Sequence, residues 1–294
     1  MAKISNWVTG ARVRTLPLAA APVMLGSATA SLVDRFDLLM AIGALLVALF
    51  LQIGVNYAND YSDGVRGTDD NRVGPLRLTA SGLVRPKAVK LAAFITFAIA
   101  GAIGLAMVAY VGQWWLIGVG AIAILAAWYY TGGKTPYGYA GLGEVAVFVF
   151  FGLVATVGTN YLMTLTLDPL AVIMGSASGL YASAVLLVNN IRDRVTDEAA
   201  GKKTIAVRLG DKRSRVLFLL MIFIPVALNL LLILIYPATV IGLLNLLLLV
   251  PISGIALSGK TPKELITALK LTSLAGFGYG LLVGLGLFLV SFNL

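Results

Sequence analysis

The 294-residue sequence contains no cysteine and no histidine. These absences exclude disulfides, thiolate nucleophiles, histidine bases, the Ser-His-Asp triad and any metal held by Cys or His. A bound metal would depend on carboxylate, amide and carbonyl oxygens. Such ligands favour Mg²⁺, with Mn²⁺ and Ca²⁺ as the alternatives.

Charge is also scarce. Only 12% of the residues are charged and 59% are hydrophobic, against about 25% and 45–50% in soluble domains. The net charge of +9 raises the question of a nucleic-acid partner. However, the basic residues lie in short segments between apolar stretches, where membrane topology explains them better. The composition therefore predicts a membrane-embedded protein that binds lipids and no nucleic acid.

Apolar stretches near the spanning length of about 20 residues recur along the chain. They predict an all-α membrane protein, a bundle of nine transmembrane helices. The segment before the first stretch is expected to be a short interfacial helix and not a signal peptide. The nine spans are expected at 15–33, 38–59, 86–111, 114–131, 143–163, 169–190, 214–235, 238–257 and 265–292.

The basic residues predict the orientation of these spans. With the N-terminus in the cytoplasm, every one of the 22 lysines and arginines except Arg35 lies on the cytoplasmic side. Such an asymmetry is typical of proteins of the cell membrane. The long polar segments 60–85 and 191–213 are then cytoplasmic, and the C-terminus is outside.

An acidic cluster closes the expected second span. Asn56, Asp60 and Asp63 follow one another at i, i+4 and i+7, so they share one face if the helix continues that far. Carboxylates this close repel one another unless a cation neutralises them. The cluster therefore predicts a metal site of oxygen ligands.

A second cluster closes the sixth span. Asn189, Asp193 and Asp197 are spaced i, i+4 and i+8, and a basic loop again follows. The likeness of the two clusters predicts a single domain built from two related halves, about 10–112 and 113–235, that face one cavity. Two facing clusters suit Mg²⁺ that is also bound by substrate phosphates.

Basic residues accompany both clusters. Carboxylates alone would repel a pyrophosphate, whereas carboxylates with Mg²⁺ and Arg or Lys can hold one and stabilise its charge as it leaves. For each basic residue taken singly, a topology charge is an equally good interpretation. The candidate diphosphate ligands are Arg66, Arg72, Arg77, Lys134, Arg192, Lys202 and Arg208.

The connection over residues 129–144 is rich in glycine and tyrosine. Lys134 can reach a phosphate from it, and its tyrosine rings can face a carbocation. Glu144 is a candidate proton acceptor or a partner for a metal or an arginine. An interfacial aromatic belt is the alternative interpretation of the tyrosines.

Together these motifs resemble the UbiA superfamily of intramembrane aromatic prenyltransferases. The closer similarity is to the actinobacterial type of its menaquinone branch, the 1,4-dihydroxy-2-naphthoate prenyltransferases. The similar segments are GARVRTLPLAAAPV at 10–23, NYANDYSDGVRGTDDNRVGPLRL at 56–78, YTGGKTPYGYAGLGEVAVFVFFG at 130–152 and NNIRDRVTDEAAGKKTIAVRLGD at 189–211. The last three spans carry no such similarity.

The resemblance implies a nine-helix domain over residues 1–294 with a polar cavity open to the cytoplasm. Its implied reaction transfers a polyprenyl group from a polyprenyl diphosphate to 1,4-dihydroxy-2-naphthoate, releasing diphosphate and CO₂ to give demethylmenaquinone. Two Mg²⁺ ions are implied. Asn56, Asp60 and Asp63 would hold one, with Asp69 as an open further ligand, and Asn189 or Asn190, Asp193 and Asp197 would hold the other. The implied catalytic set is Asp60, Asp63, Asp193, Asp197, Lys134 and Glu144.

Three alternatives compete with this interpretation. The acceptor can be another aromatic compound, such as 4-hydroxybenzoate, a haem or a chlorin. A CDP-alcohol phosphatidyltransferase also uses Mg²⁺, but its Asp-Gly…Ala-Arg…Gly…Asp…Asp run is absent from the sequence. A secondary transporter would carry its charges near the membrane midplane, whereas here the acidic residues crowd one membrane face.

Overall fold

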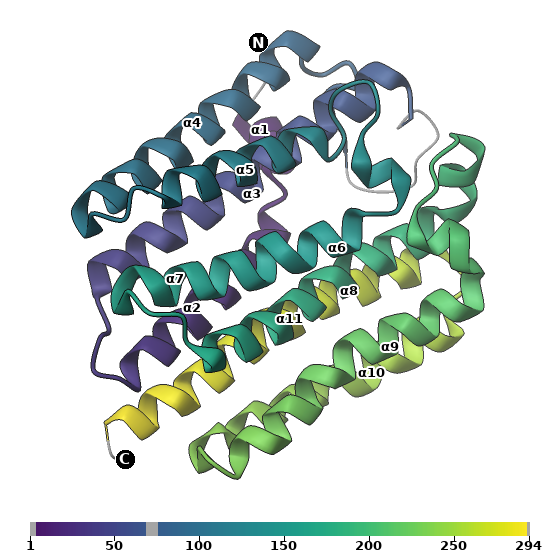
Figure 1. Cartoon of the computed structure of the whole chain (residues 1–294). Coiled ribbons are helices and arrows are strands. Elements are labelled where there is room, and N and C mark those ends of the chain that lie inside the picture. Colours follow the sequence, from purple (N-terminus) through teal and green to yellow (C-terminus); the bar gives the residue numbers. More distant parts are fainter. Residues whose placement is uncertain (1–3, 69–75, 293–294) are drawn as a thin grey trace.

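The computed structural model describes residues 4–68 and 76–292, which contain helices and no strand (Figure 1). The elements in chain order are α1 (Ile4–Ala11), η1 (Val13–Thr15), α2 (Leu16–Ser31), α3 (Leu38–Arg66), α4 (Pro86–Val111), α5 (Leu116–Tyr129), η2 (Tyr137–Ala140), α6 (Gly143–Val147), η3 (Phe148–Val154), α7 (Ala155–Thr164), α8 (Pro169–Ala199), α9 (Ile205–Ile233), η4 (Pro237–Asn245), α10 (Leu246–Ser258) and α11 (Pro262–Ser291). The predicted all-α class is confirmed.

Within the described residues, seven helices are long and apolar enough to cross a membrane. They are α3, α4, the continuous helix Gly143–Thr164 (α6, η3 and α7), α8, α9, the continuous helix Pro237–Ser258 (η4 and α10), and α11. The other two predicted spans correspond to α2 and α5, apolar helices of 16 and 14 residues. Both are shorter than the length that a straight crossing needs.

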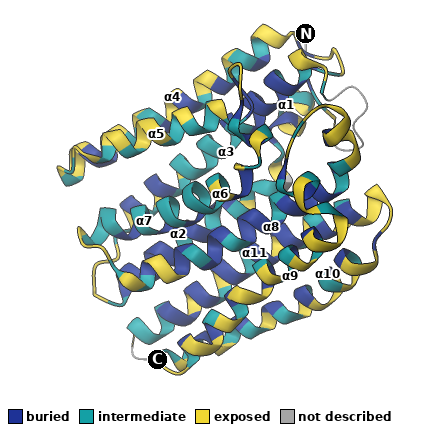
Figure 2. Cartoon of the chain, turned by 45° about the vertical axis from the view of Figure 1, so that its right-hand side comes forward, coloured by how far each residue is buried: buried dark blue, intermediate teal, exposed yellow. Residues whose placement is uncertain are grey.

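The long helices run alongside one another, and their connections differ at the two ends of the bundle (Figure 1). Short turns join α4 to α5 and α7 to α8 at one end, whereas the connections from α5 to α6 and from α8 to α9 lie at the other end. We call this second end the polar end. In Figure 2 the buried residues concentrate on α8, α2 and α11, and α4 and α5 turn mostly exposed faces outward. Exposed apolar faces on the outside of an all-helical bundle are what a lipid environment requires.

Local sequence signals fix the helix ends. The side chains of Asp37 and Asp168 cap the first turns of α3 and α8, and both helices begin at the far end from the polar end. Such caps satisfy backbone donors that the helix itself leaves open. At the polar end, α3 continues to Arg66 and stops at Gly67, whose φ of 72° suits glycine. The acidic clusters therefore lie on regular helical turns, as the predicted shared face required.

The element η3 is a π-helical segment packed against α8. A Cβ atom at Gly152 would lie 2.4 Å from Gly179 Cα and 2.5 Å from the Gly175 carbonyl oxygen. Two backbones approach this closely only where small residues meet, as is common between membrane helices. Three glycines thus set the distance between η3 and α8.

The close approach predicts a strong effect of one methyl group. Gly152→Ala should destabilise the folded protein by about 1–3 kcal/mol because the added carbon overlaps backbone that cannot move aside. The matched control is Gly118→Ala on the exposed side of α5, where a Cβ meets nothing within 4 Å. Thermal unfolding in detergent measures both. Equal melting of the two variants would contradict the packing argument.

Candidate active site

Two cavities meet at the polar end of the bundle. The smaller, the polar pocket, has a volume of ≈ 100 Å³; the larger, the apolar cavity, has one of ≈ 380 Å³. They share the lining residues Arg12, Asn59, Tyr130, Leu186 and Asn189, so the two cavities adjoin. The charged and amide side chains of the polar pocket are Asp63, Asp193, Asp197, Arg12, Arg77, Lys202, Asn59, Asn189 and Asn190.

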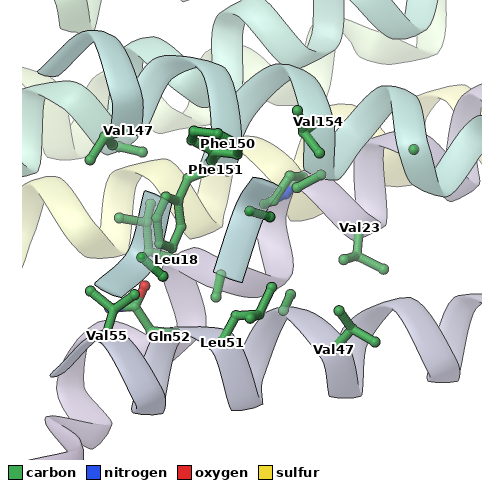
Figure 3. Close-up of a pocket in the computed structure, with 18 of the residues that line it drawn as sticks. Leu18, Val23, Val47, Leu51, Gln52, Val55, Val147, Phe150, Phe151 and Val154 are labelled. Atoms are coloured by element: carbon green, nitrogen blue, oxygen red, sulfur yellow. The ribbon is translucent and has the colours of Figure 1, made fainter. Parts of the chain in front are cut away.

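The apolar cavity lies between α2, α3 and the helix Gly143–Thr164. Figure 3 shows the side chains of Leu51 and Val55 opposite those of Phe150 and Phe151 across it. Its volume falls within the usual range of ligand pockets, about 300–1,000 Å³. Such a cavity suits a long hydrocarbon chain whose polar head lies in the pocket beside it.

On α3, the side chains that face the polar pocket are Asn59 and Asp63. Thr131 Oγ1 donates to Asn59 Oδ1 at 2.8 Å, and Tyr139 Oη donates to Asp63 Oδ1 at 2.6 Å. Asn59 was not among the site residues predicted from the sequence, although its i, i+4 spacing to Asp63 was a usable signal. The open ligand Asp69 lies outside the described residues.

The other two predicted ligands of this cluster are bonded to backbone groups. Both carboxylate oxygens of Asp60 accept backbone amides, those of Leu78 and Thr79, each at 2.8 Å. Asn56 Nδ2 donates to the Ala11 carbonyl at 2.9 Å, at the wall of the apolar cavity. Neither side chain lines the polar pocket. Their metal-binding roles stay predictions, whereas their anchoring of neighbouring segments is visible.

On α8, all three members of the second cluster line the polar pocket. Arg192 Nε and Nη2 donate to the two oxygens of Asp193 at 2.7 and 2.6 Å, and Nη2 also donates to Asn189 Oδ1 at 2.7 Å. Lys202 Nζ lies 3.4 Å from Asp197 Oδ1. Cations from the same stretch of chain therefore balance these carboxylates.

The basic residues after α3 divide into two kinds. Arg77 lines the polar pocket, with Nη2 4.0 Å from Asp63 Oδ2, and its predicted contact with a diphosphate stays a prediction. Arg66 instead donates to the carbonyl oxygens of Thr131 and Gly133. Because that side chain is used to hold the α5–α6 connection, its predicted contact with a diphosphate would require it to leave these carbonyls.

Two further basic candidates, Arg208 and Lys134, do not line the polar pocket. Arg208 Nη2 donates to the Ala140 carbonyl at 2.8 Å and Nε to the Lys203 carbonyl at 3.1 Å, so it ties two connections together. Lys134 is exposed and lines neither cavity. Arg72 lies outside the described residues.

Tyr139 connects the acidic walls of the pocket. Its hydroxyl bonds Asp63, and Lys202 Nζ lies 4.6 Å from the centre of its ring. Burial, and then the negative charge of Asp63, raise the pKa of Tyr139 above its ordinary value. The hydroxyl therefore keeps its proton at neutral pH and remains a donor to the carboxylate.

Glu144 acts one step behind the pocket. It is buried and lines neither cavity, and its Oε1 accepts a hydrogen bond from Asn190 Nδ2 at 2.9 Å. Ser183 Oγ donates to its backbone carbonyl at 2.8 Å. In this arrangement Glu144 orients Asn190. Because Glu144 lines neither cavity, its predicted role as a proton acceptor stays a prediction.

The donor set suits a divalent cation that keeps open positions. Carboxylates and amide oxygens line opposite walls of the polar pocket, on α3 and α8. Across residues 4–68 and 76–292, no three acidic or histidine side chains converge on one point. A Mg²⁺ ion commonly takes only one or two carboxylates and completes its shell with phosphate oxygens and water. The pocket therefore fits a metal that arrives with a phosphorylated ligand.

The neighbouring aspartates of α3 should respond differently to the same change. Asp60→Asn should destabilise the protein by about 1.5–3 kcal/mol, since an amide can replace only one of the two charged acceptors. Asp63→Asn should melt close to the wild type, because it relieves repulsion and still accepts from Tyr139. Thermal unfolding in Mg²⁺-free detergent measures both. A D63N protein as unstable as D60N would refute this division.

The chain is similar to known proteins of one family. A family model described as the UbiA prenyltransferase family matches residues 19–274. The 1,4-dihydroxy-2-naphthoate octaprenyltransferase of Mycobacterium tuberculosis is 47% identical over 96% of this chain and 97% of its own length. The enzyme of that name from Escherichia coli is 42% identical over 73% of this chain and 72% of its own length.

Solved structures share the fold at low sequence identity. A UbiA homolog from Aeropyrum pernix K1, in its apo form, is 17% identical with a TM-score of 0.69 and covers 99% of both chains. A UbiA homolog from Archaeoglobus fulgidus, bound to GPP and Mg²⁺, is 14% identical with a TM-score of 0.63, over 94% of this chain and 99% of that one. With the family model and the close relatives, the conclusion is direct: the chain belongs to the UbiA prenyltransferase family.

Proposed function

We propose that the protein transfers a polyprenyl group from a polyprenyl diphosphate to 1,4-dihydroxy-2-naphthoate, with Mg²⁺ and with release of diphosphate and CO₂. The observation that carries the proposal is the union of two unlike cavities. A pocket of carboxylates, amides and cations adjoins an apolar cavity nearly four times larger, and the same five residues line both. A polyprenyl diphosphate has the same division into a charged head and a hydrocarbon tail. The names of the relatives supply the acceptor.

In this proposal the diphosphate lies in the polar pocket and the isoprenoid chain fills the apolar cavity. Arg77 and Lys202 face the diphosphate, since both line the polar pocket only. Two Mg²⁺ ions would be held from opposite walls, one by Asn59 and Asp63 and one by the cluster Asn189, Asp193 and Asp197. When bound, the metal neutralises the diphosphate and stabilises the charge that grows on it as it leaves.

The reaction then occurs where the two cavities join. The bond between prenyl C1 and oxygen breaks, and its electron pair goes to the diphosphate. The π electrons at the ring carbon that bears the carboxylate form the new carbon–carbon bond. The bond from that carbon to the carboxylate then breaks, its electron pair restores the aromatic ring, and CO₂ leaves to give demethylmenaquinone in its reduced form. The apolar walls keep water from the allylic cation. Tyr130 lines both cavities, where its ring can face that cation.

The first test is turnover by purified protein with 1,4-dihydroxy-2-naphthoate and a radiolabelled prenyl diphosphate. We expect a CO₂-releasing lipid product that disappears with EDTA. Asp193→Asn should reduce kcat at least 100-fold. Asp168→Asn, at the far end of the same helix, should stay within twofold because asparagine caps a helix as well as aspartate does.

The same assay separates the alternatives. A Mg²⁺-dependent product with 4-hydroxybenzoate but not with the naphthoate would support prenyl transfer as the reaction. It would refute 1,4-dihydroxy-2-naphthoate as the acceptor. Absence of product with every acceptor, together with uptake into proteoliposomes, would refute the enzyme and support a transporter.

The proposal extends to the membrane topology. We propose nine crossings in the cell membrane, with the polar end and the N-terminus in the cytoplasm and the C-terminus outside. The short helix α2 is extended by η1, so that residues 13–31 reach about 30 Å at the usual rises per residue. The helix α5 lies between Trp114–Trp115 and Tyr129–Tyr130, aromatic pairs of the kind found at membrane interfaces. The two-halves relation remains part of this proposal.

Because the chain contains no cysteine, single introduced thiols report this topology. A membrane-impermeant maleimide should label Thr166→Cys in intact cells, since the α7–α8 turn is expected outside. It should label Lys263→Cys, at the start of α11, only after permeabilisation. Both positions are exposed. Labelling of the two from the same side would refute the odd number of crossings between them.

A further inference from the structure

Among the residues that the structure describes, the junction of the two cavities contains a single cation. Of the five described residues that line both cavities, only Arg12 is charged. Arg77 and Lys202 reach the polar pocket alone, and each lies near a carboxylate there, at 4.0 Å and 3.4 Å. A guanidinium therefore stands where the charged half of the site meets the apolar half.

The backbone at Arg12 is held in an uncommon conformation. Its φ and ψ are 54° and 52°, in the left-handed region that costs a non-glycine residue about 1–2 kcal/mol. Bonds on both sides hold it there. Arg12 N donates to the Thr9 carbonyl at 3.1 Å and Thr15 N to the Arg12 carbonyl at 2.9 Å, while Asn56 Nδ2 binds the preceding carbonyl, that of Ala11. The fold thus tolerates strain in order to place this residue.

The segment before Arg12 is seated tightly on α3 and on residue 78. A Cβ at Gly10 would lie 2.6 Å from Leu78 Cδ1, and Tyr57 Oη donates to the Trp7 carbonyl at 2.9 Å. Leu78 is itself held through its amide by Asp60. The position of Arg12 is therefore determined by packing, and its side chain enters the site from a fixed support.

The acceptor must meet the prenyl carbon at this junction, because the diphosphate lies on one side and the hydrocarbon on the other. An aromatic hydroxy acid brings a flat apolar ring and one carboxylate. A carboxylate taken out of water needs a cation that can form hydrogen bonds with it. A guanidinium meets this need, because two of its N–H groups are parallel and can donate to both carboxylate oxygens. The other three junction side chains with polar groups, Asn59, Tyr130 and Asn189, are neutral.

We propose that the Arg12 guanidinium binds the carboxylate of the aromatic acceptor and so orients its ring toward the prenyl carbon. This inference rests on the proposed function. Arg12 is in that case a specificity residue for acids and takes no part in holding the diphosphate.

The test separates the two ligands and the two parts of the acceptor. Arg12→Asn removes the charge but keeps a side chain that tolerates positive φ, Arg12→Lys keeps the charge, and Arg35→Gln is the control at the far end of the bundle. Binding is measured for 1-hydroxy-2-naphthoate, for 1-naphthol and for a prenyl thiodiphosphate that does not react. Because naphthols partition into detergent equally for every variant, ratios to the wild type are compared.

Arg12→Asn should weaken the binding of 1-hydroxy-2-naphthoate at least tenfold. It should leave the affinities for 1-naphthol and for the thiodiphosphate within twofold of the wild type. Unchanged thiodiphosphate binding also shows that the variant is folded. Arg12→Lys should lose less than Arg12→Asn. Equal weakening of naphthoate and naphthol, or weakening of the thiodiphosphate alone, would overturn the assignment. A wild type that binds thiodiphosphate but no naphthoate would overturn the proposed acceptor itself.

Discussion

The mutual repulsion of carboxylates is the constraint on which the polar end depends. Asp63, Asp193 and Asp197 share one small pocket of ≈ 100 Å³. Each is balanced by a nearby donor or cation: Tyr139 for the first, Arg192 for the second and Lys202 for the third. These partners come from the connections or from the helix itself, so the folded chain tolerates the charges without a metal. A metal ion competes with partners that are already in place.

The connections at this end are part of the scaffold. Arg66 binds carbonyl groups of the α5–α6 connection, and Arg208 joins that connection to the one before α9. Asp60 likewise holds the backbone at residues 78–79, by accepting hydrogen bonds from the two amides there. Charged side chains that the sequence predicts to bind substrate or metal thus form hydrogen bonds with the backbone of the segments around the site.

The sequence was a good guide wherever periodicity decides the outcome. The apolar stretches located the helices, and the i, i+4 and i+8 spacing placed Asn189, Asp193 and Asp197 on one wall. It was a poor guide where a distant segment decides. Asp60 differs from Asp63 because amides 18 and 19 residues away occupy it, and Arg66 contacts a carbonyl 65 residues away. The sequence did not single out Arg12 for the same reason, because its place between the two cavities depends on segments that are distant along the chain.

The π-helical segment η3 has a consequence for the apolar cavity. A π-helical turn contains one residue more than an α-helical turn, and Phe150 and Phe151, adjacent in sequence, both line the cavity (Figure 3). The additional residue also sets the rotational phase of everything that follows it, so Val154, Ala155 and Gly158 face the same space. Removing it would turn the whole of α7 by about 100° about its axis. The cavity wall is thus specified by a count of residues as much as by their identities.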